Sequence, residues 1–221
     1  MKAVLLTGFL FIAAVVSSQD HRFVNFYTGA NFPNGDYGKV ESNKAGAAMT
    51  GMVLEVEAGE IYENRFGFSV KGGYATNRVD YEGLEESGDL SPIDLKGENH
   101  RYSFILPGGI YRMRNEKVFV DLKLHAGVVF SRLPEITRVL LIPDNYRTTD
   151  FDGDDDISFG YNPSISAGVI FDRVKVFIQG GLMEFKAEYF TNSNQAFSHP
   201  IEVHQKYSNM EMLVGVSWSF Y

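Results

Sequence analysis

The chain has no cysteine among its 221 residues. This absence excludes a disulfide framework, a thiolate metal site, a cysteine nucleophile and a lipidated cysteine anchor. Positive charge is also in short supply, since 20 Lys and Arg stand against 28 Asp and Glu, for a formal net charge of −8. This balance gives no basic footprint for nucleic acid, which is therefore not an expected partner.

Long apolar runs are missing too, apart from one at the start of the chain. Lys2 precedes an apolar stretch, and small residues before Gln19 offer a cleavage site. The stretch is shorter than the roughly 20 apolar residues that span a bilayer, so we predict a cleaved signal peptide over 1–18 rather than an anchor helix. Residues 19–221 show no linker or composition shift and are expected to form one domain. Any membrane insertion must then use strands.

What the chain does have is a two-residue alternation of apolar and polar side chains. Because side chains alternate between the faces of a strand, each alternating stretch predicts a strand with one apolar face. Eight such strands are predicted, at about 22–31, 47–59, 64–77, 101–112, 118–131, 158–171, 174–189 and 210–221. The fourth carries its apolar residues at Tyr102, Phe104, Leu106 and Ile110. Pro107 lacks a backbone donor and predicts a bulge or kink there.

The connections between these strands alternate between short and long. The short ones are 60–63, 113–117 and 172–173, and the long polar ones are about 32–46, 78–100, 132–157 and 190–205. An up-and-down barrel with both termini at the short-turn end produces this pattern. We therefore predict an all-β fold, an eight-stranded antiparallel up-and-down transmembrane β-barrel with short periplasmic turns and long outer loops.

A secreted lipocalin-like carrier of an apolar ligand is the alternative, because it also has eight alternating strands, with the apolar face turned inward. Two features favour lipid on the outside. The polar face is rich in glycine and serine, which suit a narrow interior. Aromatic residues such as Phe66, Tyr102 and Phe171 gather near the ends of the apolar faces, as in interfacial girdles.

The final strand carries the most specific pattern. Its apolar face consists of Met210, Met212, Val214, Val216, Trp218 and Phe220. With the signal peptide, the eight strands and the loop asymmetry, the ending Gly-Val-Ser-Trp-Ser-Phe-Tyr over 215–221 resembles the OmpA/OmpX-like small outer-membrane barrels, and it is most similar to the outer-membrane β-barrel domain family of Bacteroidota. The resemblance implies export to the bacterial outer membrane and recognition by the barrel-insertion machinery. The residues expected to carry that insertion signal are Val214, Val216, Trp218, Phe220 and Tyr221.

The polar faces suggest what fills the interior. The residues expected to point inward are Glu55, Glu57, Arg65, Lys71, Asp121, Lys123, His125, Gln179 and Glu211. An eight-stranded barrel is only just wide enough for side chains, so we interpret this set as a network of ion pairs and hydrogen bonds rather than a pore. His125 with a cross-strand serine would suit a lipid-modifying enzyme, a less favoured alternative. No catalytic residue and no cofactor is assigned.

The loop 149–156 is acidic, with carboxylates at Asp150, Asp152, Asp154 and Asp156 that could ligate calcium. It departs from an EF-hand in its glycine position and lacks the final glutamate, so a solvated loop is the simpler interpretation, and no metal ligand is assigned. We expect a monomeric, non-catalytic outer-membrane protein with a scaffold, surface-interaction, envelope-assembly or secretion role. Its long loops would bind any partner, because loops carry recognition in such proteins.

Overall fold

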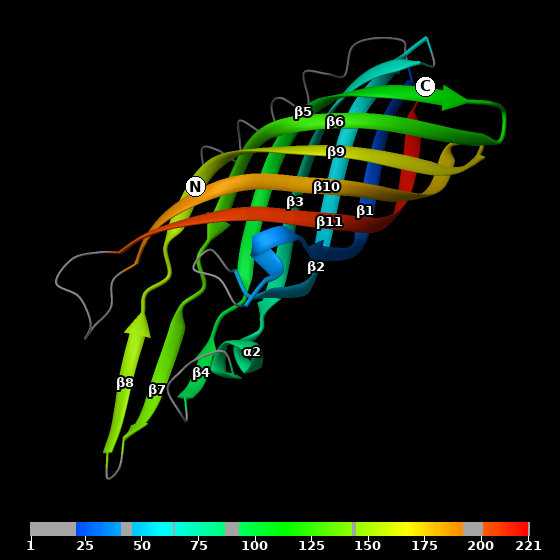
Figure 1. Cartoon of the computed structure of the whole chain (residues 1–221). Coiled ribbons are helices and arrows are strands. Elements are labelled where there is room, and N and C mark those ends of the chain that lie inside the picture. The colour runs from blue at the N-terminus through cyan, green and yellow to red at the C-terminus, as the bar shows by residue number, and fades with distance from the viewer. Residues whose placement is uncertain are drawn as a thin grey trace.

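A closed barrel of eight antiparallel strands dominates the computed structural model (Figure 1). The structure describes residues 21–40, 46–63, 65–86, 93–142, 145–191 and 201–220. The barrel strands, in spatial order, are β1 (His21–Pro33), β11 (Ile201–Phe220), β10 (Val174–Thr191), β9 (Asp155–Phe171), β6 (Val118–Arg132), β5 (His100–Arg114), β3 (Phe66–Val79) and β2 (Ala48–Tyr62). Each corresponds to one predicted strand, so the predicted all-β, eight-stranded barrel is confirmed. The predicted signal peptide and Tyr221 lie outside the described residues.

Short turns join the strands at one end of the barrel, as predicted. Asp172 has a φ of 55° in the two-residue connection between β9 and β10, and Glu63 has a φ of 48° between β2 and β3. Such left-handed positions match the twist of tight hairpins. At the seam, β11 pairs with β1 from Arg22↔Phe220 to Pro33↔Asn209, which closes the barrel. We call this end of the barrel the short-turn end and the opposite one the long-loop end.

Two connections that were predicted as long polar loops contain regular structure, and there the prediction was wrong. The chain between β3 and β5 forms α2 (Tyr81–Glu86) and β4 (Ile93–Gly97). The chain between β6 and β9 forms β7 (Ile136–Ile142) and β8 (Asn145–Phe151). These strands pair in the order β4-β7-β8 and form a separate antiparallel sheet, which stands beyond the long-loop end of the barrel (Figure 1). Segments of five to seven residues without clear alternation gave no strand signal.

The first long connection also differs from a plain loop. It contains a short 3-10 helix, η1 (Gly35–Gly38), whose Tyr37 side chain is completely buried. Asn34 caps this helix by accepting a hydrogen bond from the Gly35 backbone N–H at 2.8 Å.

The facing of β5 is opposite to the prediction. Tyr102, Phe104 and Leu106 are buried inside the barrel, as is Ile110, whereas the neighbouring Ile105 is exposed. Apolar residues occupy both faces of β5, so alternation did not distinguish inside from outside, and Tyr102 belongs to no outer girdle. At Pro107 the ladder of β5 with β6 is interrupted, since neither Leu106 nor Pro107 has a partner between Ile105↔Val128 and Gly108↔His125. No bulge accompanies the break, because the register is the same on both sides of it and the pairing of β5 with β3 is continuous.

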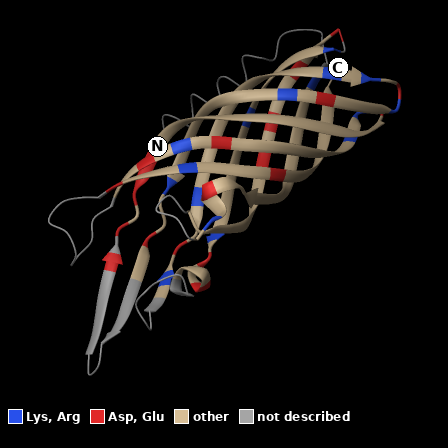
Figure 2. Ribbon diagram, viewed as in Figure 1, with Lys and Arg blue, Asp and Glu red and all other residues tan. Residues whose placement is uncertain are grey.

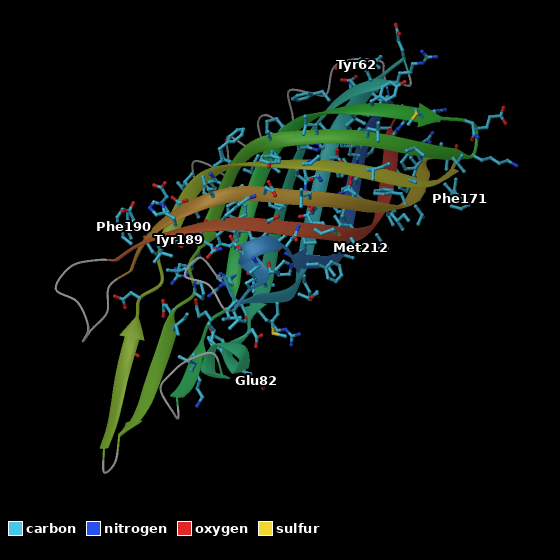
Figure 3. All side chains as sticks on the ribbon, viewed as in Figure 1. Tyr62, Glu82, Phe171, Tyr189, Phe190 and Met212 are labelled. Atoms are coloured by element: carbon cyan, nitrogen blue, oxygen red, sulfur yellow. The ribbon has the colours of Figure 1, made fainter. Side chains whose placement is uncertain are left out.

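The outer wall of the barrel is an apolar belt. Every strand contributes exposed apolar side chains, for example Phe26, Leu54, Phe68, Ile105, Leu124, Ile165, Ile178 and Val214. On β11 the belt runs from Phe220 to Met210, which at about 3.3 Å per residue and a tilt of about 45° gives a height of roughly 23 Å. Figure 3 shows Phe171 and Met212 of this belt pointing away from the barrel. None of the described helices has the length and apolar character to cross a membrane.

Candidate functional site: the filled barrel interior

The charged residues that the sequence predicted to face inward lie mainly in the barrel interior. Eight of the predicted set are buried, namely Glu55, Glu57, Lys71, Asp121, Lys123, His125, Gln179 and Glu211. Arg65 differs from the prediction, because it is exposed in the turn that precedes β3. It has the inward parity of its strand, but the strand begins one residue later, so its guanidinium reaches water. Figure 2 shows acidic and basic positions distributed along the barrel wall.

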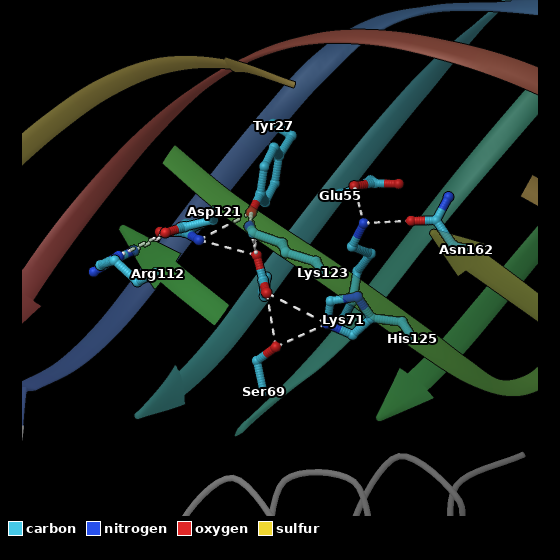
Figure 4. A network of polar contacts seen from close by, with 11 residues as sticks. Tyr27, Glu55, Ser69, Lys71, Arg112, Asp121, Lys123, His125 and Asn162 are labelled. Atoms are coloured by element: carbon cyan, nitrogen blue, oxygen red, sulfur yellow. Dashed lines mark hydrogen bonds and ion pairs between the residues drawn. The ribbon is translucent and has the colours of Figure 1, made fainter. Parts of the chain in front are cut away.

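Glu57 on β2 is the centre of the interior network. Figure 4 labels three of its partners, Tyr27, Ser69 and Lys123. Its Oε2 accepts hydrogen bonds from Lys123 Nζ at 2.7 Å and Asn25 Nδ2 at 3.0 Å, and also from the Tyr27 hydroxyl. Its Oε1 accepts a hydrogen bond from Ser69 Oγ at 2.7 Å. A fully buried carboxylate needs this many donors, because an unpaired charge inside a protein is very costly.

Ser69, His125 and Glu57 together resemble the components of a hydrolytic triad. Ser69 Oγ lies 2.8 Å from His125 Nε2, and Glu57 Oε1 lies 3.4 Å from the same nitrogen. A working triad places the serine and the acid on opposite ring nitrogens, so that the acid orients the base. Here both contact Nε2, while Nδ1 has no hydrogen-bond partner among the described residues. The arrangement is that of a structural hydrogen-bond network.

Lys71 on β3 links a second pair of buried carboxylates. Its Nζ lies 3.3 Å from Glu55 Oε2 and donates to Asn162 Oδ1 at 2.8 Å. Asn162 Nδ2 in turn donates to Glu211 Oε2 at 2.8 Å. The chain of contacts joins β2, β3, β9 and β11 across the interior, so these charges tie opposite walls of the barrel together.

One strong interior pair was not predicted. Arg112 on β5 donates from Nε and Nη2 to the two carboxylate oxygens of Asp121, each at 2.7 Å. The guanidinium carbon also lies 4.9 Å from the ring centroid of Phe119. Asp121 was predicted to face inward, but its partner was missed because the facing of β5 was assigned the wrong way round. A search for an inward arginine opposite Asp121 on the neighbouring strand would have found it.

Aromatic side chains fill the long-loop half of the interior. We define this aromatic cluster as Tyr37, Tyr102, Phe185, Tyr189 and Tyr207, all buried. Phe185 and Tyr207 stack with ring centroids 4.4 Å apart, and Tyr189 shares a 2.8 Å hydrogen bond with Tyr207. Tyr37 enters from η1, and its ring centroid lies 4.6 Å from that of Tyr207, so the first long connection contributes a side chain to the interior at this end.

The carboxylates of the acidic loop contact separate partners in the part of the chain that the structure describes. Asp150 Oδ1 accepts a hydrogen bond from Thr137 Oγ1 at 2.9 Å. Asp154 Oδ2 accepts one from the backbone N–H of Phe190 at 2.8 Å, and Asp156 Oδ2 accepts one from that of Glu188 at 3.3 Å. The last two carboxylates fasten β10 to the start of β9.

Comparisons with known proteins bear on the fold. No family model and no curated protein matches the chain. A major outer membrane protein from Thermus thermophilus has a TM-score of 0.50 at 12% identity, over 90% of this chain and 99% of that chain. Neisserial surface protein A has a TM-score of 0.45 at 11% sequence identity, over 90% of this chain and 97% of that chain. The outer membrane protease OmpT from Escherichia coli has a TM-score of 0.47 at 11% sequence identity, over 91% of this chain and 97% of that chain.

At these identities the likeness extends to the fold alone. The fold that we expected from the resemblance to small outer-membrane barrels is confirmed. The narrower resemblance to the Bacteroidota family stays a prediction, because no family model supports it.

Proposed function

We propose that this protein is an integral, non-catalytic protein of a bacterial outer membrane, which acts through the parts that extend from the long-loop end. The observation that carries the proposal is the division between the two sides of the barrel wall. Apolar side chains cover the outside of all eight strands, while buried charged side chains pair with one another inside, as Lys71 does with Glu55 and Lys123 with Glu57. A barrel in lipid needs this arrangement, because lipid solvates the outer wall and cannot solvate charge.

The same division argues against the secreted lipocalin-like carrier. Such a carrier would present charged residues to water and keep an apolar interior for its ligand. Here the interior contains Glu57, Lys123 and the other buried charges, and the outer wall exposes residues such as Leu124 and Ile178 by more than 60%. In water, so large an apolar surface would aggregate.

The geometry around His125 supports a non-catalytic role. Ser69 and Glu57 contact the same ring nitrogen, and all three side chains are buried in the interior, out of reach of lipid. A lipid-modifying enzyme needs its nucleophile and base at the lipid interface.

The sheet β4-β7-β8 and helix α2 are the parts best placed to meet a partner. They stand beyond the long-loop end of the barrel (Figure 1). Recognition elements in small barrels are expected on such extensions, since the barrel itself is committed to lipid. We propose a surface-interaction or envelope-scaffold role for this end, with the barrel as a monomer.

Membrane integration is tested by fractionation. We expect the protein to stay in washed membranes after extraction with alkaline carbonate. On a gel it should run as a compact band before boiling and as a slower band afterwards, because the closed barrel resists the detergent until it is heated. Release by carbonate alone would contradict the membrane barrel.

The functional part of the proposal needs a separate test. A deletion strain would be scored for detergent sensitivity of its envelope and complemented with two variants. Ser69→Ala should keep the heat-shifted band and restore the wild-type level, because its hydroxyl supplies one of several hydrogen bonds to Glu57 and no chemistry is assigned to it. Replacement of the extension 93–97 and 136–151 by short Gly-Ser linkers should fail to restore it, while the heat-shifted band is kept. A changed lipid A profile in the deletion strain, restored by wild type and not by Ser69→Ala, would favour the enzyme instead.

A further inference from the structure

Three exposed side chains with metal-binding atoms meet on the outer wall, close to the long-loop end of β10 and β11. They are Glu188, Glu202 and His204, and one ligand atom from each lies within 4.8 Å of the other two. Among the described residues no other group of His, Asp and Glu is as close. The group is separate from the interior network and from the acidic loop of the sequence analysis.

The strand ladder fixes the positions of these three residues. Glu188 and His204 are direct cross-strand partners in the pairing of β10 with β11, and Glu202 lies two residues before His204 on the same face. The ladder continues beyond them to Thr191↔Ile201. Their backbones are therefore held by regular hydrogen bonding, as a site on rigid elements requires.

The distances suit a small tetrahedral ion. Glu188 Oε1 lies 3.5 Å from His204 Nδ1, and Glu202 Oε1 lies 3.3 Å from His204 Nε2. Ligands about 2.1 Å from a tetrahedral zinc ion are separated by about 3.4 Å from one another. The two glutamates contact different nitrogens of the ring. One ligand atom of each residue nevertheless lies within 4.8 Å of the other two, and the side chains, which are half or more exposed, have room to turn toward one ion.

Negative charge exceeds positive charge around the group. Lys206, further along the same face of β11, lies 3.5 Å from Glu184 Oε1 and is engaged there, and Lys186 is its cross-strand neighbour. On the other side, Asp154 and Asp156 bind the backbone of Phe190 and Glu188, which adds negative charge next to the group. Attraction of a divalent cation follows from this excess.

We propose that Glu188, Glu202 and His204 form a binding site for a divalent transition metal ion of the zinc class. One imidazole nitrogen and two carboxylate oxygens match the borderline character of zinc, whereas calcium prefers oxygen ligands only. Three protein ligands leave one position for water or for an oxygen of another molecule. The ion would cross-link β10 and β11 above the apolar belt.

The test uses the full-length barrel, refolded without a histidine tag and titrated with zinc chloride by calorimetry at neutral pH. We expect one site with micromolar affinity. His204→Lys replaces the imidazole with an ammonium group that offers no neutral donor, so it should reduce the affinity at least tenfold, on the scale of lost metal-site groups. The double variant Glu188→Gln with Glu202→Gln should have the same effect.

Two controls separate the site from general effects. Glu116→Gln, in the exposed turn at the short-turn end, should bind zinc as the wild type does. All variants should keep the heat-shifted band, since the three residues are exposed and outside the core. If His204→Lys or the double glutamine variant binds zinc as tightly as the wild type, or if the wild type does not bind it, the group is a surface ion-pair cluster and the proposal is wrong.

Discussion

The two halves of the barrel interior are filled by different kinds of side chain. Toward the short-turn end, Glu57, Lys123 and the pair Arg112–Asp121 satisfy one another's charges, with the rings of Phe119 and Phe177 packed beside them. Toward the long-loop end, the aromatic cluster fills it with rings. The charged half depends on complete pairing, because each missing partner leaves a buried charge. The aromatic half depends on volume and ring contact, so it should tolerate a change of shape better.

The largest effect should come from removal of the central carboxylate. Glu57→Ala leaves Lys123, Tyr27 and Asn25 without their shared acceptor, and we expect a loss of about 3–5 kcal/mol in the free energy of unfolding. Guanidinium unfolding of the barrel in lipid vesicles would measure it. Glu116→Ala, in an exposed turn, serves as the control and should change stability by less than about 0.5 kcal/mol. A small loss in both variants would show that the charged half is not tightly coupled.

A double-mutant cycle between Glu57 and Lys123 measures how strongly the two buried charges depend on each other. Lys123→Met alone leaves Glu57 short of its charged donor, while the combination with Glu57→Ala removes both charges. We expect the double variant to be more stable than the sum of the single losses predicts, with a coupling of about 0.5–3 kcal/mol. Additive losses would mean that the ion pair itself contributes nothing. The measurement is again guanidinium unfolding in vesicles.

The smallest effect is expected in the aromatic half. Phe185→Leu removes the ring that stacks on Tyr207 but keeps most of the volume, so we expect a loss of about 1–2 kcal/mol. Phe190→Leu, further along β10 but on the exposed outer face, is the matched control and should be nearly neutral. If Phe185→Leu lowers the free energy of unfolding as much as Glu57→Ala does, the aromatic half is no more tolerant of substitution than the charged half.

The same contrast explains what the sequence could and could not predict. Charged residues at alternate positions of β2 and β6 indicated which face of each strand points inward. Glu57 and Lys123 lie in strands whose other face is apolar and suited to lipid, so their own face had to be the inner one. Aromatic residues carry no such information, since a tyrosine suits both a lipid interface and a packed interior. Tyr102 was therefore assigned to the wrong face, and with it the partner of Asp121.

Tertiary contacts decided the remaining differences. Tyr37 is held by rings from β11 and β5 that are distant in sequence, so its burial could not be read from the first connection. The strands β4, β7 and β8 are stabilised by one another rather than by their own pattern. Arg65 has the right parity for the interior, yet lies outside it because β3 begins at Phe66.

The burial of Tyr37 has an electrical consequence. A barrel lined with glutamates and lysines would ordinarily suggest a conductor for ions. Here Glu57 and Lys123 are paired, and the ring of Tyr37 packs against His100 and Tyr207 at the long-loop end of the interior. These contacts hold the charged side chains in place within a filled interior. The barrel is therefore expected to act as an electrical insulator across the bilayer.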